Sequence, residues 1–272
     1  MRRSGSADEL TPVSNPAPGR PATGLVGSSP AWGTLHRMSF ASALVIFAHP
    51  DDGEFMCGGT VAVWVAEGTE VHYCVVTDGS AGSNDPGVTR DGLVPIREAE
   101  QRAAAEVLGV KSVSFLWYRD GELEVNLETR KAVTRVVRRV RPEVIVAPDP
   151  SRLWFGSGYI NHWDHKQAGL LALCAVMPDA PTRLQFPELL DEGLEPFEVP
   201  QLYLSGEEID TYVDVTKTID LKIASLACHV SQGTTDPDTE EWVRERARTH
   251  GEQAGFEYAE AFKAFSFGDE DE

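Results

Sequence analysis

The unbroken apolar run at residues 43–48 limits the folds open to this chain more than any other segment. Such a short continuous run is typical of a strand that is buried on both faces of a parallel sheet. His49 and Pro50 follow it directly, and proline cannot extend a strand ladder. A small-residue turn at 58–60 then leads into a predicted helix at 61–67. The segment predicts a strand–loop–helix unit with polar residues at the carboxyl end of the strand, where open α/β sheets bind ligands.

Strand and helix signals alternate through the remainder of the chain. The patterns predict strands at 71–77, 113–117, 143–147 and 201–204, and helices at 97–108, 127–140 and 216–230. Their short spacing favours right-handed crossovers and therefore a parallel sheet. A chain of 272 residues is long enough for one large domain of this kind. We predict an α/β fold, a mostly parallel sheet flanked by helices, in a single domain that spans residues 39–268.

The two ends of the chain lack the patterns of a folded core. Residues 1–38 carry five of the 17 prolines and no periodic apolar pattern, which predicts a disordered N-terminal extension. They also lack the run of about seven apolar residues that a signal peptide needs. Met38 stands directly before the first predicted strand, and our hypothesis is that translation begins there. Residues 269–272 read as an acidic, solvated tail.

Composition excludes several classes of partner. The formal charge of −19 disfavours nucleic acid and anionic membranes, because such a surface repels phosphate groups. No stretch approaches the roughly 20 apolar residues of a membrane span. The four cysteines show no CxxC spacing, which favours free thiols and a cytoplasmic location. The sequence does not decide between a monomer and a homo-oligomer.

Two short signatures contain the parts of a mononuclear zinc site. His49 and Asp52 follow the first predicted strand, and His165 lies in the loop after the strand at 143–147. Strand ends that face the same crevice can bring these residues together across the sequence. Three protein ligands plus an open water position define a catalytic zinc site. The first pair alone could be a helix cap, but the second histidine cluster makes the metal interpretation the stronger one.

The residues beside the ligands suggest acid–base chemistry. Asp51 is free because Asp52 is committed to the metal, so Asp51 can act as the general base toward a metal-activated water. His162 could be a fourth ligand, a core histidine or a group that stabilises the oxyanion. We favour the third role, because a closed site with four ligands would be structural. Asp164 could then orient His162, as carboxylates beside a metal site often do.

Six segments of the chain together resemble one known family. The AHPDD, GGT, REAE, YRDG, HxDH and HVSQ segments, within residues 42–232, resemble the PIG-L-like (LmbE-like) de-N-acetylases. The resemblance implies a Rossmann-like fold and hydrolysis of an acetamide, usually on an N-acetylglucosamine unit. The implied roles are zinc ligation by His49, Asp52 and His165, base catalysis by Asp51, an oxyanion contact from His162, and substrate-hydroxyl contacts from Arg97 and Asp120.

Departures from the family pattern leave the substrate open. Gly53 and Glu54 follow the two aspartates, as in the bacillithiol-type branch, and Trp163 replaces a usual proline. Ile160 stands where some members have a tyrosine, so the role of Tyr159 is undecided. The alternatives are an amidase acting on a thiol conjugate and a non-catalytic, metal-containing sugar-binding module. The spare carboxylate of Asp51 argues against the second alternative. His229 reads as a helix-face histidine more readily than as a ligand.

Overall fold

The computed structural model describes residues 40–155 and 157–267. The predictions for the extension at 1–38 and the tail at 269–272 lie outside these residues. Within them, every strand predicted from an apolar run is present.

The main sheet has seven strands in the order β3-β2-β1-β4-β7-β9-β8. Their bounds are β1 Ser42–Phe47, β2 Glu70–Thr77, β3 Ser112–Tyr118, β4 Val144–Pro148, β7 Gln201–Ser205, β8 Thr211–Asp214 and β9 Ala259–Ser266. The first five strands in that order pair in parallel, whereas β9 is antiparallel to both β7 and β8. The sheet is therefore mostly parallel, as predicted, with an antiparallel edge that the sequence patterns did not indicate.

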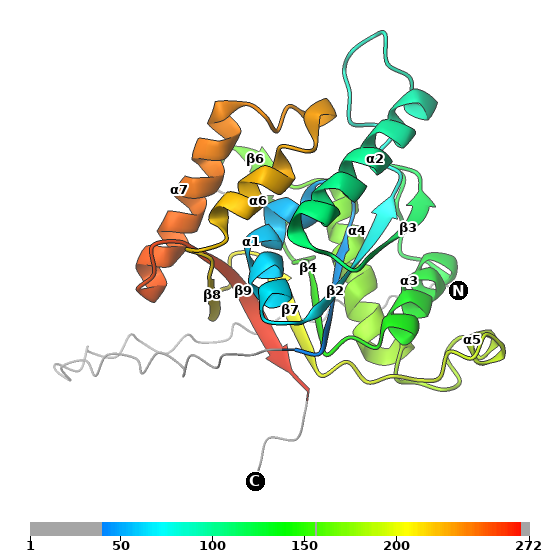
Figure 1. Ribbon diagram of the computed structural model, residues 1–272. Helices are drawn as coiled ribbons and strands as arrows, with labels where there is room; N and C mark the ends of the chain where they lie inside the picture. Colours follow the sequence, from blue (N-terminus) through cyan, green and yellow to red (C-terminus); the bar gives the residue numbers. More distant parts are fainter. Residues whose placement is uncertain (1–39, 156, 268–272) are drawn as a thin grey trace, which may run out of the picture. The chain divides into compact units, whose positions relative to one another are not determined.

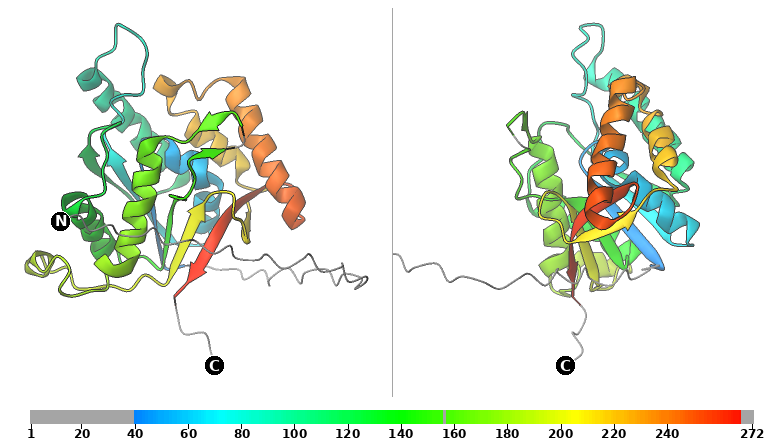
Figure 2. Two further views of the ribbon diagram at one scale, coloured as in Figure 1. Left: turned by 180° about the vertical axis from the view of Figure 1, so that it is seen from behind. Right: turned by 90° about the vertical axis from the view of Figure 1, so that its left-hand side faces the viewer.

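Helices cover both faces of the sheet (Figures 1 and 2). On one face α1 (Asp52–Ala66) and α2 (Arg90–Leu108) pack on the strands, α6 (Ile219–Leu226) packs on these two helices, and α7 (Pro237–Ala254) packs on β9. The other face carries α3 (Leu127–Val140) and α4 (Trp163–Cys174), which continues into a π-helical turn at Ala175–Asp179. The short α5 (Glu188–Asp191) lies between α4 and β7. This layered arrangement confirms the predicted α/β class.

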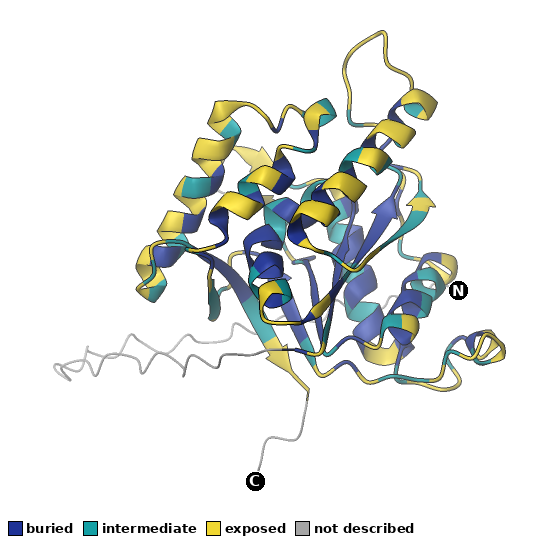
Figure 3. Ribbon diagram, in the orientation of Figure 1, coloured by how far each residue is buried: buried dark blue, intermediate teal, exposed yellow. Residues whose placement is uncertain are grey.

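Strand β1 is buried on both faces, which explains its continuous apolar run. Leu44 and Ile46 belong to the apolar cluster beneath α3 and α4, while Val45 and Phe47 belong to the cluster beneath α1 and α2. Figure 3 shows the central strands buried along their length. Burial of each such side chain contributes about 1.5–3 kcal/mol, so β1 anchors both layers.

Helix α1 begins at Asp52, earlier than the predicted 61–67, and is broken once. Cys57 has φ −150° and ψ 23°, so the helix consists of two short pieces. A buried ion pair from distant elements spans the break. Glu260 of β9 accepts hydrogen bonds from the backbone N–H groups of residues 59 and 60, and Lys222 of α6 donates to both Glu260 and the Phe55 carbonyl. These contacts supply partners for backbone groups that the break leaves without helical bonds.

The remaining elements lie near the ends of β4 and α6. A two-stranded ribbon, β5 (Trp154–Phe155) and β6 (Tyr159–Ile160), precedes α4, and a 3-10 turn at Val230–Gln232 follows α6 where a continuous helix was expected. All four cysteines are free, as predicted. Among the described residues, none of the helices combines the length and apolar character needed to cross a membrane.

Candidate active site

The signature residues meet at the carboxyl ends of β1 and β4, where the strand order reverses direction. His49 lies two residues beyond β1, Asp52 is the first residue of α1, and His165 lies in the first turn of α4. Such a reversal is the usual ligand-binding position in doubly wound sheets, because the crossovers leave it in opposite directions. The two halves of the site therefore come from neighbouring strands that are far apart in the sequence.

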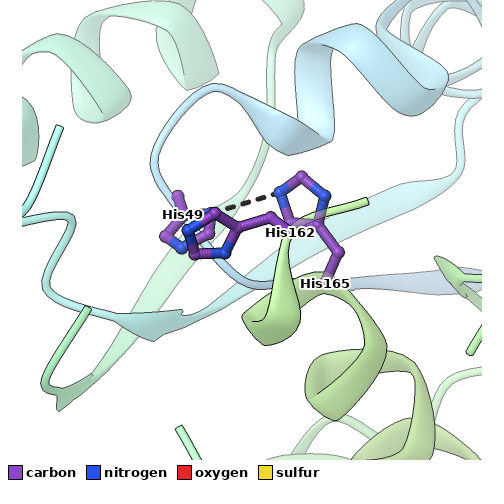
Figure 4. A group of neighbouring side chains, drawn as sticks. All are labelled: His49, His162 and His165. Atoms are coloured by element: carbon purple, nitrogen blue, oxygen red, sulfur yellow. Dashed lines mark hydrogen bonds between the residues drawn. The ribbon is translucent and has the colours of Figure 1, made fainter. Parts of the chain in front are cut away.

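Three side-chain donors converge at this point. Nδ1 of His49 lies 3.2 Å from Nε2 of His165 and 3.3 Å from Oδ2 of Asp52, and His165 Nε2 lies 3.0 Å from Asp52 Oδ1. Figure 4 shows the His49 and His165 rings facing each other, with His162 beside them. Two donors bound tetrahedrally to zinc at about 2.0–2.1 Å would be about 3.3–3.4 Å apart. The separations of 3.0–3.3 Å are compatible with that requirement, with a different oxygen of Asp52 facing each ring, and His162 also lies close enough to His49 and His165 to share an ion with them.

The outer nitrogen of each of these histidines has its own hydrogen-bond acceptor. Nε2 of His49 lies 3.2 Å from Asp120 Oδ1 and 3.3 Å from Asp164 Oδ2, and Nδ1 of His165 lies 3.0 Å from Asn161 Oδ1. These oxygens accept, so the outer nitrogens carry the protons and the inner nitrogens present lone pairs to each other. With both rings neutral, two facing lone pairs and a carboxylate are stabilised by a positive charge between them, either a proton on His49 or a metal ion. The residues present thus fit a divalent metal with nitrogen and oxygen ligands.

The electrostatics of the ligands favour positive charge in the same place. Burial lowers the pKa of His49, but hydrogen bonds to Asp120, Asp164 and Asp52 outweigh burial and raise the pKa well above its usual value. Burial likewise acts to raise the pKa of Asp52, but the two histidines hold it well below the usual range. The site therefore keeps Asp52 ionised and attracts a cation.

Asp51 lies beside the donor triangle without belonging to it. Its Oδ2 accepts a hydrogen bond from Arg97 Nη2 at 3.1 Å, and its backbone N–H donates to Gln101 Oε1 at 3.0 Å. Its φ of 106° is a strained conformation for a residue other than glycine. Burial and the neighbouring charge of Asp52 raise the pKa of Asp51 to about 7, against the opposing effect of Arg97. A carboxylate with a pKa near neutrality can take up and release a proton.

Arg97 and Asp120 lie behind the ligands, and each is only 3 % exposed. Arg97 donates to the Pro50 and Gly79 carbonyls as well as to Asp51. The two carboxylate oxygens of Asp120 contact His49 Nε2 and the Ala81 N–H. Arg97 thus contacts Asp51 and Asp120 contacts His49, and the substrate-hydroxyl contacts expected for both side chains stay a prediction.

His162 caps the N-terminus of α4 and faces the open side of the site. Its Nδ1 accepts a hydrogen bond from the Asp164 N–H at 3.2 Å, so the proton of the neutral ring is on Nε2. Its ring centroid lies 4.6 Å from that of His49. Burial and the nearby charge of His49 lower the pKa of His162. His162 is thus placed as a neutral donor close to the ligands.

Asp164 does not hold His162 in the way we expected. Its carboxylate is fully buried and contacts His49 Nε2 and the Gly121 N–H, the latter at 2.7 Å. Only the backbone of Asp164 reaches His162. The expectation was wrong because α4 turns the side chain of its second residue toward β1. Asp164 therefore orients His49, one of the candidate ligands.

Three exposed aromatic residues lie in the segment that leads into α4. Trp154, Tyr159 and Trp163 are each more than half exposed, and all three belong to the β5–β6 ribbon or the start of α4. Burial and the negative charge of Asp52 raise the pKa of Tyr159. We call Trp154, Tyr159 and Trp163 the aromatic rim.

Sequence reasoning missed two polar residues at this site. Asn161 accepts from His165 and also ties the base of the ribbon, because its side-chain amide donates to the Arg152 carbonyl and its backbone N–H to the Leu153 carbonyl. Gln101 holds the backbone of Asp51. Asn161 stands four residues before His165, one helical turn away, which is a weak signal. Nothing in the sequence marks Gln101 as a site residue apart from its position one helical turn after Arg97.

The comparisons with known proteins agree with this geometry. Residues 44–176 match the model of the PIG-L family, described as GlcNAc-PI de-N-acetylase. The diacetylchitobiose deacetylase of Thermococcus kodakarensis is 32% identical over 223 residues, covering 81% of each chain. The structure of the N,N'-diacetylchitobiose deacetylase from Pyrococcus horikoshii superposes with a TM-score of 0.76 at 32% identity, covering 84% of each chain.

The chain therefore belongs to the PIG-L family. It is an enzyme of the hydrolase class and of the deacetylase kind, and its Rossmann-like fold is shared with the solved deacetylases. The same architecture also occurs in GalB of Pseudomonas putida KT2440, a 4-carboxy-2-hydroxymuconate hydratase that is 25% identical with a TM-score of 0.69, covering 86% of this chain and 99% of GalB. The fold alone consequently does not define the reaction.

Proposed function

We propose that this protein is a zinc-dependent hydrolase that removes the acetyl group from an N-acetylglucosamine-type sugar. The observation that carries the proposal is the convergence of His49, Asp52 and His165 on one point, with Asp51 beside them and outside the ligand set. A ligand set with three donors leaves a position for water, which a structural site does not need.

The roles of the side chains follow from their contacts. His49, Asp52 and His165 would hold the metal, which when bound supplies a Lewis acid and lowers the pKa of a water molecule. Asp51 takes the proton of the attacking water and returns a proton to the departing nitrogen. The products are acetate and a free amine.

The neighbouring groups position this chemistry. Nε2–H of His162 donates to the oxygen of the acetamide as negative charge develops there. Asp120 and Asp164 fix the ring of His49, and Asn161 fixes that of His165. Such outer hydrogen bonds set the tautomer and the basicity of ligating imidazoles. Arg97 holds the carboxylate of Asp51.

Two observations support a sugar as the substrate. The aromatic rim presents ring faces beside a polar, acidic site, and aromatic rings pack well against the apolar faces of sugars. The relatives from Thermococcus kodakarensis and Pyrococcus horikoshii are diacetylchitobiose deacetylases. We therefore propose diacetylchitobiose and N-acetylglucosamine as the first compounds to test.

The deciding experiment compares acyl donors on protein loaded with Zn²⁺. Release of free amine and acetate is followed for diacetylchitobiose, for N-acetylglucosamine and for the amide of a sugar–thiol conjugate. We expect turnover of an N-acetylated sugar that stops on chelation, with the Asp51→Asn variant as the inactive control. Preferential cleavage of the thiol conjugate would support the amidase alternative. Binding of sugar without any amine release would support the non-catalytic module.

We further propose a cytoplasmic location, supported by the four free cysteines. A homo-oligomer also stays a proposal, and the molar mass from light scattering tests it directly.

A further inference from the structure

Asp51 is held in an uncommon backbone conformation at the point where catalysis is proposed. Its φ of 106° and ψ of −30° are unfavourable for an L-residue with a side chain. Such a conformation persists only where the surroundings over-determine it. Arg97 supplies one restraint, through the Pro50 carbonyl and the Asp51 carboxylate. A second restraint acts on the backbone N–H of Asp51, which donates to a side-chain acceptor.

Gln101 supplies that acceptor. Its side-chain Oε1 accepts from the Asp51 N–H at 3.0 Å, while its Nε2 donates to Glu54 Oε1 at 2.8 Å. Gln101 is completely buried. The two contacts together fix which end of the amide is oxygen, because the end facing Asp51 must accept and the end facing Glu54 must donate. A rotated amide would place two donors against each other at Asp51.

Glu54 is in turn fixed by His229. Nε2 of His229 lies 3.3 Å from Glu54 Oε2, and both side chains are completely buried. Each oxygen of Glu54 therefore has one partner. The main chain at His229 is anchored as well, because the Thr234 hydroxyl donates to the His229 carbonyl at 2.9 Å. Nδ1 of His229 is buried and has no hydrogen-bond partner among the described residues.

A purely structural role explains this arrangement poorly. Burial of a carboxyl group and an imidazole costs free energy, and well-packed apolar residues in their place are often at least as stabilising. The three side chains nevertheless connect α1, α2 and the turn after α6 by polar contacts. Their line of hydrogen bonds ends at the backbone of Asp51, within the residues proposed for catalysis.

We propose that Gln101, Glu54 and His229 form a positioning network that holds the backbone of Asp51 so that its carboxylate faces the attacking water. They are positioning residues and touch no substrate. The inference rests on the proposed role of Asp51 as the general base.

The first test replaces Gln101 by leucine, which has a similar size and neither hydrogen-bonding group. We expect kcat of Gln101→Leu to fall about tenfold to a hundredfold, because a displacement of about 1 Å at a reacting group can cost that much. KM and zinc content should stay within about twofold of wild type. Glu100→Ala is the matched control, since Glu100 is the preceding residue of α2 and makes two 2.7 Å hydrogen bonds to Ser231 without contacting Asp51. This control should lower the thermal midpoint and leave kcat unchanged.

The second test makes the Gln101→Leu substitution in a variant that lacks the proposed general base, Asp51. In the Asp51→Asn background, Gln101→Leu should lower the residual rate by less than about twofold, since a residue that acts through Asp51 loses its effect when the carboxylate is gone. An equal fall in both backgrounds would overturn the network. A wild-type rate for Asp51→Asn alone would instead refute the proposed base, which is a different failure.

A third pair of variants applies if Gln101→Leu does not fold. His229→Gln keeps an N–H donor for Glu54, whereas His229→Leu removes it. We expect kcat to fall about tenfold in His229→Leu, with most of the loss restored in His229→Gln. Equal rates in the two variants, at unchanged zinc content, would show that the hydrogen bond to Glu54 does not matter for turnover.

Discussion

The two halves of the site differ in how firmly they are held. The β1 half, His49 to Asp52, is buried, and the side chains of His49 and Asp52 are 8 % and 16 % exposed. In the β4 half, the side chain of His165 is 23 % exposed and Trp163 is 54 % exposed. The difference indicates that protein contacts hold the β1 half more firmly, and we expect the substrate to approach from the β4 half.

The contacts of each half explain this difference. Around His49, three carboxylates are within hydrogen-bonding distance of the ring, and two of them are anchored in turn by the backbone N–H groups of Ala81 and Gly121. His165 has Asn161 as its outer partner, on a short two-stranded ribbon. A site built this way fixes the reacting groups on the sheet and leaves the substrate contacts on a less packed segment.

The largest expected effect comes from removal of a ligand in either half. His49→Ala and His165→Ala should both lose the bound metal, and turnover should fall to the level of the buffer, because two remaining ligands hold zinc poorly. Metal analysis and amine release measure this. The thermal midpoint should fall further in His49→Ala than in His165→Ala, because His49→Ala also leaves three carboxylates close together without their shared partner. A larger drop in thermal midpoint for His165→Ala would contradict the idea that the β1 half is held more firmly.

Asp51→Asn should keep the metal and lose turnover by about 10²–10⁴-fold, the usual contribution of a general base. The pH profile provides a second check. Burial and Asp52 raise the pKa of Asp51 to about 7, and a protonated base is inactive, so activity is lost as pH falls through that pKa. A bound cation adds an opposing effect, so the acid limb should lie at or below about pH 7. If the residual activity of Asp51→Asn falls at low pH in the same way as that of the wild type, another group is the base.

His162→Ala should lower kcat by about 10²–10³ with zinc content preserved, the cost of one lost oxyanion donor. A loss of zinc instead would make His162 a ligand. The pKa of His162 is lowered and its Nδ1 accepts from a backbone N–H, so we expect the neutral ring to act as the donor. The alkaline limb should therefore survive in the variant.

The smallest effect concerns the aromatic rim. Trp163→Ala and Trp154→Ala should raise KM for an N-acetylated sugar by roughly fivefold to tenfold, about 1–1.4 kcal/mol, and leave kcat within about threefold. Trp242→Ala is the matched control, since Trp242 is similarly exposed but belongs to α7. Steady-state kinetics of the three variants test this prediction. An equal rise in KM for Trp242→Ala would show that the aromatic rim does not bind the substrate.

Local sequence patterns, which involve residues close together in the chain, predicted most of the helices and strands. The run at 43–48 and the helix at 127–140 were located well because burial on both faces and an Asn126 cap leave local signals. Helix α7 and strands β8 and β9 went unpredicted, although Pro237 and Gly255 flank α7 at positions that favour helix ends. The antiparallel edge depends on pairing between distant segments, which no local pattern records.

The candidate ligands stand out in the sequence because of their residue types, whereas the orientation of their neighbours does not. Few residue types bind zinc, so histidine and aspartate at two strand ends are conspicuous. The direction of a side chain depends on the helix that carries it, and so Asp164 was assigned to His162 when it faces His49. The positive φ of Asp51 and the burial of Gln101 arise from tertiary contacts and leave no mark in the sequence.

The ion pair across the break in α1 sets an order of events during synthesis. Glu260 lies on β9, the last strand that the structure describes, and it binds the second piece of the helix whose first residue is Asp52. A nascent chain still attached to the ribosome before residue 260 has emerged lacks this restraint. With the proposed ligand set, metal capture by the growing chain should consequently wait for β9, although His49 and Asp52 are synthesised well before that strand.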